Sequence, residues 1–207
     1  MAGSWLSTRP RLLTKEPPAA ETQTPPTATT ATTVEARVRA LFEAHYAAIW
    51  RLLRRLGVET AQLDDAAQEV FWVAAKRVQD IQSGSEQAFL YGVALRIASN
   101  AHRRRRASPE LVSDAELEAI AHPGLNPEQN ARATQMRALL DVVLDQLAPE
   151  LRTVFVLCEL EGMEVRDAAA LEGIPVGTAS SRLRRARQAF SAVSKRVHAR
   201  LVTQGGL

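Results

Sequence analysis

The chain has 207 residues, enough for one medium domain or two small ones, and its 26 Lys and Arg residues exceed its 23 Asp and Glu residues by only three. A single cysteine, Cys158, excludes an internal disulfide and a multi-cysteine metal site. Because no apolar segment approaches the roughly 20 residues that span a membrane, and the N-terminus lacks the features of a secretory signal, we expect a cytoplasmic protein.

The charges are unevenly distributed along the chain. Between residues 141 and 164 there are six acidic residues and one arginine, whereas between residues 165 and 200 there are eight basic residues and two acidic ones. Such separation of the two signs indicates a chain that meets two different surfaces, one of them a polyanion.

The first half of the chain is expected to form a small helical domain over residues 34–106. Residues 1–33 are rich in Thr, Pro and Ala and are expected to be a disordered tail, because that composition buries little apolar surface. Apolar residues at helical spacing then predict three helices, over about 34–56, 61–78 and 86–105. Asp64 and Asp65 are interpreted as the start of the second helix, where the helix dipole favours negative charge, rather than as an acid/base pair.

A linker over residues 107–130, which contains prolines and the acidic segment SDAELEAI, leads to a second helical domain over 131–200 and a short tail, 201–207. Helices are predicted over about 127–146, 149–161 and 165–171, followed by a last helix that ends near Arg200. No alternation with strand period occurs. The fold class is therefore predicted to be all-α, as two small helical domains joined by a flexible linker.

The segment GIPVGTASSRLRRAR, residues 173–187, is typical of the tight turn and second helix of a helix-turn-helix. Pro175 ends the preceding helix, because proline cannot donate a backbone hydrogen bond. Apolar residues then recur at helical spacing and form one stripe: Ala179, Leu183, Ala186 and Phe190. An apolar seam beneath an arginine-rich face is what a helix needs to dock on a small domain and enter the major groove of DNA.

Two other surfaces are candidates for binding. Five arginines and no acidic residue lie between residues 96 and 106, one to two turns after Phe89 and Tyr91. Cations with nearby aromatic rings hold single-stranded nucleic acid, although a solvated basic helix end has the same composition. In the second helix, Trp72 lies beside a polar face and is either a protein-binding hot spot or a side chain that covers the edge of its own core.

Residues for catalysis are sparse. The four histidines are scattered without metal-ligand spacing, and no nucleophile, phosphate-binding or dinucleotide-binding motif occurs. Cys158 lies in an apolar run and is interpreted as a small buried hydrophobe. We therefore expect no enzyme, no cofactor and no metal site.

Several segments, taken in chain order, resemble the bacterial sigma-70 initiation factors of the extracytoplasmic-function (ECF) group. The family's helix that binds the polymerase clamp resembles LDDAAQEVFWVAAKR, residues 63–77, and its segment that opens and reads the −10 promoter element resembles FLYGVALRIASNAHRRRR, residues 89–106. The motif that opens the second domain resembles NPEQ, residues 126–129, and the pattern that reads the −35 element resembles residues 144–187. The resemblance covers about residues 34–195.

The resemblance implies a non-enzymatic factor that binds core RNA polymerase through its clamp and flap and directs it to promoter DNA. The clamp is expected to contact Asp65, Gln68, Glu69 and Trp72. The flap is expected to contact the acidic residues of 141–164 and the apolar run 154–157. The −10 element is expected to be bound by Phe89, Tyr91, Arg96, Ser99, Asn100, Arg103 and Arg104. At the −35 element, the base-facing residues are expected to be Ser180, Ser181, Arg184 and Arg185. Phosphate contacts there are expected from Thr178, Arg182 and Arg187. An anti-sigma factor is a further implied partner, and the free chain is expected to be a monomer.

The chain departs from the family pattern at several positions. Arg96 and Asn100 stand where Asn and Asp are common, and Glu172 and Ala179 replace an apolar residue and Val. Two other function classes remain open. A stand-alone helix-turn-helix regulator would bind duplex DNA tightly without polymerase, and it would dimerise on paired half-sites. An interaction protein would bind polymerase or an anti-sigma partner but would no longer read DNA.

Overall fold

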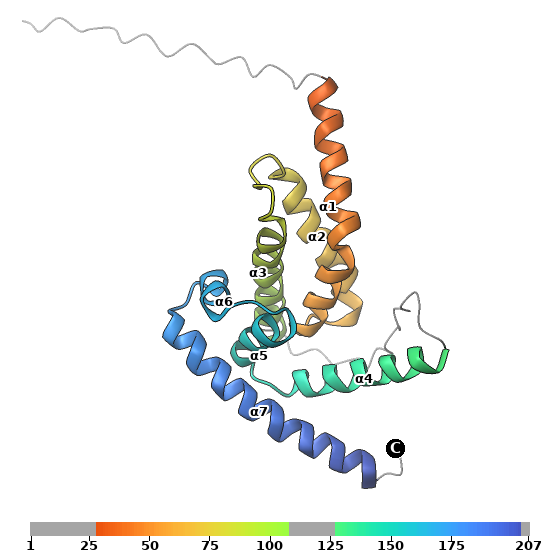
Figure 1. The fold of residues 1–207 in the computed structure, drawn as a ribbon, viewed down its shortest axis with the longest axis vertical. Coiled ribbons are helices and arrows are strands. Elements are labelled where there is room, and N and C mark those ends of the chain that lie inside the picture. Colours follow the sequence, from red (N-terminus) through yellow and green to blue (C-terminus); the bar gives the residue numbers. More distant parts are fainter. Residues whose placement is uncertain (1–27, 108–126, 204–207) are drawn as a thin grey trace, which may run out of the picture.

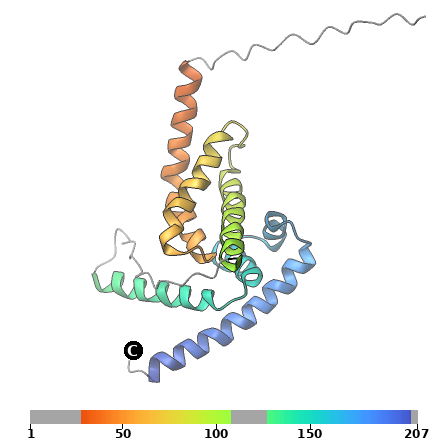
Figure 2. The same ribbon diagram turned by 180° about the vertical axis from the view of Figure 1, so that it is seen from behind.

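The computed structural model describes residues 28–107 and 127–203, and every regular element within these ranges is helical (Figures 1 and 2). The predicted all-α class is confirmed. The elements, in chain order, are α1 (Ala28–Arg55), η1 (Thr60–Gln62), α2 (Leu63–Lys76), α3 (Glu86–Ala107), α4 (Pro127–Asp145), α5 (Pro149–Phe155), η2 (Val156–Leu160), α6 (Val165–Glu172) and α7 (Val176–Thr203). Of these, η1 is a turn of 3-10 helix, and η2 is a π-helical continuation of α5.

Helices α1, α2 and α3 pack side by side and enclose the core of the first domain (Figure 1). Its largest fully buried side chains are Tyr91, Ile49, Leu52, Leu53, Leu63, Leu90, Val58, Val70 and Val78. Burial of each such side chain is worth roughly 1.5–3 kcal/mol, which makes this the main stabilising term of the domain. Asp64, in the first turn of α2, also accepts hydrogen bonds from Trp50 Nε1 at 3.0 Å and from Tyr46 Oη at 3.3 Å on α1.

The second domain is built on the predicted helix-turn-helix. Gly173 ends α6 with a φ of 67°, a left-handed conformation that favours glycine, and α7 begins three residues later. The predicted apolar stripe of α7 faces inward, since Ala179, Leu183 and Ala186 are buried and Phe190 stacks on Phe155 of α5 with ring centroids 4.6 Å apart. The core of this domain is therefore positioned by α5 and α7.

Some boundaries differ from the predicted ones. Residues 28–33 were expected to be disordered but form the first turns of α1, because no proline lies between residue 27 and the rest of that helix and extension of an existing helix costs little. Helices α3 and α4 extend into both ends of the predicted linker. Residues 108–126, with the acidic segment SDAELEAI, lie outside the described residues, as do residues 1–27 of the predicted tail.

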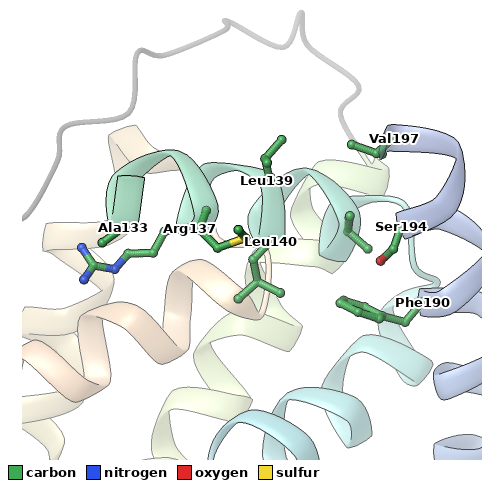
Figure 3. Close-up of a pocket in the computed structure, with 9 residues that line it drawn as sticks. Ala133, Arg137, Leu139, Leu140, Phe190, Ser194 and Val197 are labelled. Atoms are coloured by element: carbon green, nitrogen blue, oxygen red, sulfur yellow. The ribbon is translucent and has the colours of Figure 1, made fainter. Parts of the chain in front are cut away.

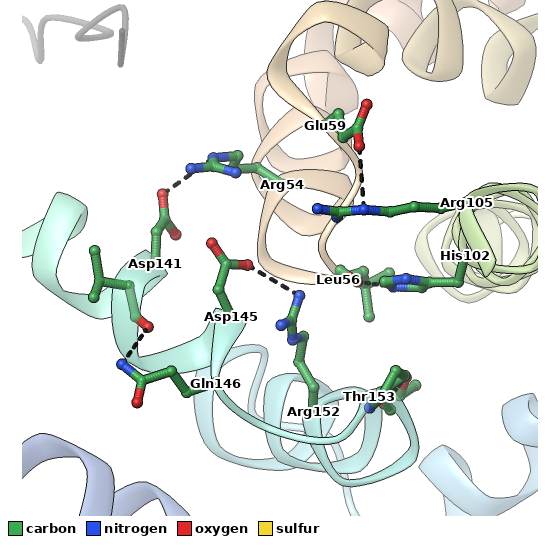
Figure 4. A network of polar contacts seen from close by, with 12 residues as sticks. Arg54, Leu56, Glu59, His102, Arg105, Asp141, Asp145, Gln146, Arg152 and Thr153 are labelled. Carbon is green, nitrogen blue, oxygen red and sulfur yellow. Dashed lines mark hydrogen bonds and ion pairs between the residues drawn. The ribbon is translucent and has the colours of Figure 1, made fainter. Parts of the chain in front are cut away.

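The two domains pack against each other at the end of α1 and along α3 (Figures 1 and 4). Arg54 of α1 pairs with Asp141 of α4, with Nε and Oδ2 3.3 Å apart. The Arg152 guanidinium of α5 pairs with Asp145 at 3.1 Å and presses against the backbone at Gly57 of the first domain. The sequence predicted two domains but no contact between them.

A buried carboxylate joins α6 to the recognition helix α7. Glu172 Oε2 lies 3.1 Å from Nη1 of Arg182, while its Oε1 is buried without a hydrogen-bond partner. Burial raises the pKa of the Glu172 carboxyl, and the Arg182 charge opposes that rise. The glutamate that replaces the family's usual apolar residue is therefore accommodated by its pair with Arg182, at the cost of one unsatisfied oxygen.

Gly57 and Gly84 form a matched pair for testing the contact between domains. Both have a left-handed φ, 88° and 87°, but a Cβ at Gly57 would collide with the Arg152 guanidinium, whereas a Cβ at Gly84 would meet nothing within 4 Å. Gly84→Ala should cost only backbone strain, about 1–2 kcal/mol. Gly57→Ala should lose a further ~1–3 kcal/mol from overpacking against Arg152. Urea unfolding of both variants checks this, and equal losses would show that Arg152 does not press on Gly57.

Glu172→Gln should make stability less dependent on pH. Because the folded pKa of Glu172 is raised, the folded state holds this proton after the unfolded state has released it, so stability falls as pH rises from about 4.5 through the folded pKa. The variant lacks this loss, so its unfolding free energy relative to the wild type should be higher at pH 8 than at pH 4. Thermal or urea unfolding at the two pH values measures the difference, and a constant difference would contradict the burial of this carboxyl.

Candidate nucleic-acid and polymerase interfaces

The exposed face of α7 carries the four residues predicted to face bases. Ser180, Ser181, Arg184 and Arg185 are all exposed, and they lie opposite the buried stripe of this helix. The Ser181 hydroxyl donates to the Thr178 carbonyl oxygen at 2.9 Å. Neither Arg184 nor Arg185 forms an ion pair with a carboxylate in the described part of the chain. The helix-turn-helix therefore presents two arginines whose charges are not neutralised by the protein.

The two arginines predicted to bind phosphates have internal partners. Arg182 is held by Glu172, and its side chain is only 27% exposed. Arg187 donates from Nε and Nη2 to Oε1 of Glu159, at 2.9 and 2.6 Å, but its side chain is 61% exposed. A phosphate could reach Arg187 without a change in packing, whereas Arg182 is fixed mainly within the turn.

The outer face of α3 brings together four of the residues predicted for the −10 element. Arg96, Ser99, Asn100 and Arg103 line a groove of about 540 Å³, and Arg103 donates to the Asn100 side-chain oxygen. Arg104 is also exposed. The opposite wall of this groove belongs to the second domain, through α5 and α6.

The two aromatic residues predicted for the same role do not share this exposed face. Tyr91 is 2% exposed, and its hydroxyl donates to Glu161 Oε2 at 2.6 Å while it accepts from Gln87 at 3.1 Å. Burial, with the hydrogen bond to Glu161, raises the pKa of Tyr91 to about 12. Phe89 is half-buried against the core. In this arrangement of the domains, Tyr91 is not available to stack on a base.

The predicted polymerase-binding residues lie on one exposed face of α2. Gln68, Glu69 and Trp72 line a shallow groove of about 450 Å³ together with Phe42 and Phe71. Trp72 is 60% exposed, which favours a binding side chain over one that covers its own core, and the Lys76 ammonium lies 3.1 Å from its ring centroid. Asp65 is exposed one turn earlier on the helix. Sequence reasoning missed Phe42, because its position fits the inner apolar stripe of α1.

The prediction that the apolar run 154–157 contacts the flap is wrong. Val154, Phe155, Val156 and Leu157 are all buried, so they belong to the core of the second domain. The next residue, Cys158, is half-buried, and burial raises the pKa of its thiol. An apolar run alone does not distinguish a core helix from a docking surface, and in this structure the run belongs to the core.

An apolar groove of about 520 Å³ lies between α4 and the C-terminal half of α7 (Figure 3). Its lining is apolar apart from Arg137 and Ser194, so it carries no set of groups for catalysis. Within residues 28–107 and 127–203, no cluster of three His, Cys, Asp or Glu side chains could hold a metal ion. None of the helices in the same ranges is long and apolar enough to cross a membrane.

Comparison with known proteins assigns each domain to a family. Residues 41–108 match the family described as Sigma-70 region 2, and residues 137–190 match Sigma-70, region 4. The RNA polymerase sigma-H factor of Pseudomonas aeruginosa is 32% identical, over 67% of this chain and 76% of its own length. The ECF RNA polymerase sigma-E factor of Escherichia coli K12 is 30% identical, over 64% of this chain and 74% of its own length. With the ECF RNA polymerase sigma factor SigE of Mycolicibacterium smegmatis, 30% identity extends over 72% of this chain but spans only 58% of the relative.

Solved structures share the fold. CnrH, in complex with the cytosolic domain of CnrY, has a TM-score of 0.56 at 25% identity, over 80% of this chain and 92% of that one. The sigma factor RpoE of Bartonella quintana, in complex with the anti-sigma factor NepR, has a TM-score of 0.59 at 19% identity, over 76% of this chain and 96% of that one. On the family matches and the sequence identities together, the chain belongs to the ECF group of sigma-70 RNA polymerase sigma factors, which are non-enzymatic transcription initiation factors.

Proposed function

We propose that this chain binds core RNA polymerase and directs it to promoters with a −35 element, read by α7, and a −10 element, read by α3. The observation that carries the proposal is the exposed pair Arg184 and Arg185 on α7, whose neighbours Arg182 and Arg187 are held by carboxylates. Arginines that lack a protein partner on a helix-turn-helix are available for the acceptors of DNA.

At the −35 element, Arg184 and Arg185 donate to base edges, together with the hydroxyls of Ser180 and Ser181. A bidentate pair of arginine with guanine is the commonest contact of this kind. The phosphate contacts of Thr178, Arg182 and Arg187 set the register of the helix. Arg187 is more exposed than Arg182, so it can more readily leave its ion pair with Glu159 and bind a phosphate.

At the −10 element, Arg96, Ser99, Asn100 and Arg103 bind the separated non-template strand, with one base turned out of the stack. Unstacking of that base costs a few kcal/mol, which the arginines offset through phosphate contacts. Phe89, Tyr91 and Arg104 belong to the same proposed site. For Tyr91 this requires release of its hydroxyl from Glu161.

The exposed face of α2 docks on the polymerase clamp, with Trp72 as its anchor and Asp65, Gln68 and Glu69 as its polar rim. A contact of the second domain with the flap would use its exposed side chains. The partner in the RpoE structure of Bartonella quintana supports an anti-sigma factor as a further partner of this chain. We place the protein in the cytoplasm with the polymerase, as a monomer when free. The exposed clamp-like face of α2 favours this function over a stand-alone regulator.

Replacement of Arg184 or Arg185 with Ala should weaken binding of the polymerase complex to its −35 element by roughly 1–3 kcal/mol and relax the sequence preference there. Competition binding with −35 duplexes that differ by one base pair measures both effects. The matched control is Arg166→Ala, which removes one 71% exposed positive charge from the neighbouring α6. This control should leave the order of preferred sequences unchanged. If neither recognition-helix variant alters that order, the base contacts are assigned to the wrong residues.

Trp72→Ala should weaken binding to core polymerase by about 2 kcal/mol, the loss expected for a hot-spot tryptophan. The control is Met136→Ala, which removes a 68% exposed apolar side chain on α4, outside the proposed clamp surface. Titration of fluorescent protein with core polymerase in the absence of DNA gives both dissociation constants. Equal affinities of the two variants would place the clamp surface elsewhere on the chain.

A further inference from the structure

A carboxylate ties the two helices of the helix-turn-helix together. Arg182, in the second turn of α7, donates from Nη1 to Oε2 of Glu172, the last residue of α6, at 3.1 Å. Figure 1 shows α6 beside the first turns of α7, and the two helices are in contact. The Glu172 side chain is only 10% exposed, and its Oε1 is buried without a partner. This carboxylate therefore has Arg182 as its one partner in the described part of the chain.

The Arg182 guanidinium is held on one side and open on the other. Its side chain forms no further hydrogen bond or ion pair within residues 28–107 and 127–203. In these ranges the buried side-chain nitrogens and oxygens that lack a partner are Arg152 Nε and Glu172 Oε1, so Nε and Nη2 of Arg182 reach solvent. Two donors of a fixed guanidinium are thus available to an acceptor outside the protein.

Stability does not explain why Glu172 occupies this position. A buried carboxylate oxygen without a hydrogen bond destabilises the folded state, and a buried ion pair contributes little net stability after desolvation. An apolar side chain, which the family pattern has here, would avoid the buried oxygen. It would also leave no charge buried, because Arg182 already reaches solvent. The effect of Glu172 on Arg182 is therefore the better explanation for the pair.

Arg187, the neighbouring arginine on α7, is held in a different way. Its Nε and Nη2 both donate to one oxygen of Glu159, in a pair whose side chains are 61% and 33% exposed. A phosphate has to displace Glu159 to use those two donors. At Arg182 the donors in the same two positions are already open, and a phosphate can bind them with Glu172 in place.

We propose that Glu172 is a positioning residue for the −35 contact: it fixes the Arg182 guanidinium so that Nε and Nη2 meet a DNA phosphate while Nη1 stays on the carboxylate. The proposal rests on the proposed function, which assigns Arg182 to a phosphate. A side chain that is already held loses little conformational entropy on binding, whereas immobilising a free arginine weakens binding by about threefold to tenfold.

Glu172→Leu and Glu172→Gln separate position from charge. Both variants remove the negative charge and have side chains of similar size, but only glutamine keeps an oxygen that accepts from Arg182. Binding of the polymerase complex to a labelled −35 duplex is measured by anisotropy. Glu172→Leu should bind about threefold to tenfold more weakly than the wild type, and Glu172→Gln should bind at least as tightly as the wild type. Equal affinities of the two variants would overturn the proposal.

Urea unfolding of the same variants distinguishes positioning from a structural role. Leucine removes the unpaired buried oxygen, so Glu172→Leu should unfold at a urea concentration no lower than that of the wild type. Weaker DNA binding by a variant that is no less stable cannot come from loss of the fold. If Glu172→Leu binds weakly and also unfolds at a lower urea concentration than Glu172→Gln, the pair is structural and the proposal is overturned.

Arg182→Ala tests the phosphate contact itself. The plot of log binding constant against log salt concentration should become shallower by about one unit, as expected for one lost phosphate contact. In this background Glu172→Leu and Glu172→Gln should bind equally. An unchanged slope would overturn the positioning role of Glu172, while −35 reading by Arg184 and Arg185 would stand. If the wild-type complex binds the −35 duplex no better than a scrambled duplex, the proposed function falls as well.

Discussion

Pairing between the carboxylates of residues 141–164 and arginines of the chain is the interaction on which the rest of this structure depends. Within residues 141–164, nearly every carboxylate holds an arginine: Asp141 with Arg54, Asp145 with Arg152, Glu159 with Arg187, Glu161 with Arg55, and Glu164 with Arg166. These pairs decide which arginines are fixed to the protein and which remain available for DNA. A chain with a net charge of only +3 can therefore present strongly basic faces on α3 and α7.

Two of these pairs, Arg54 with Asp141 and Arg55 with Glu161, join the two domains. Exposed ion pairs contribute little net stability, while a half-buried carboxylate such as Glu161, with two partners, contributes more but is resolvated on separation. The contact between the domains therefore combines two ion pairs with apolar packing, because buried residues of both domains belong to one hydrophobic cluster.

Local patterns predicted the helices well, because amphipathic spacing and the turn at Gly173 record local chemistry. Local patterns failed to predict burial and charge pairing where these depend on residues far apart in the sequence. The separation of acidic and basic residues indicated two external surfaces, yet most of those acids pair with arginines of this chain. Tyr91 was predicted to stack on a base because it lies shortly before a run of arginines. Its burial depends on contacts with residues distant in the sequence, such as Glu161, 70 residues away. No pattern within α1 distinguished half-exposed Phe42 from the buried residues of the same stripe.

Reconstituted transcription tests the central claim most directly. Core polymerase is mixed with the purified protein and a library of promoter-like duplexes, and the transcripts are sequenced. The account predicts start sites that depend on the protein and that share two upstream sequence elements at a fixed spacing, one for each domain. Tight binding of the protein to duplex DNA, without core binding or any protein-dependent start site, would contradict it and indicate a stand-alone regulator.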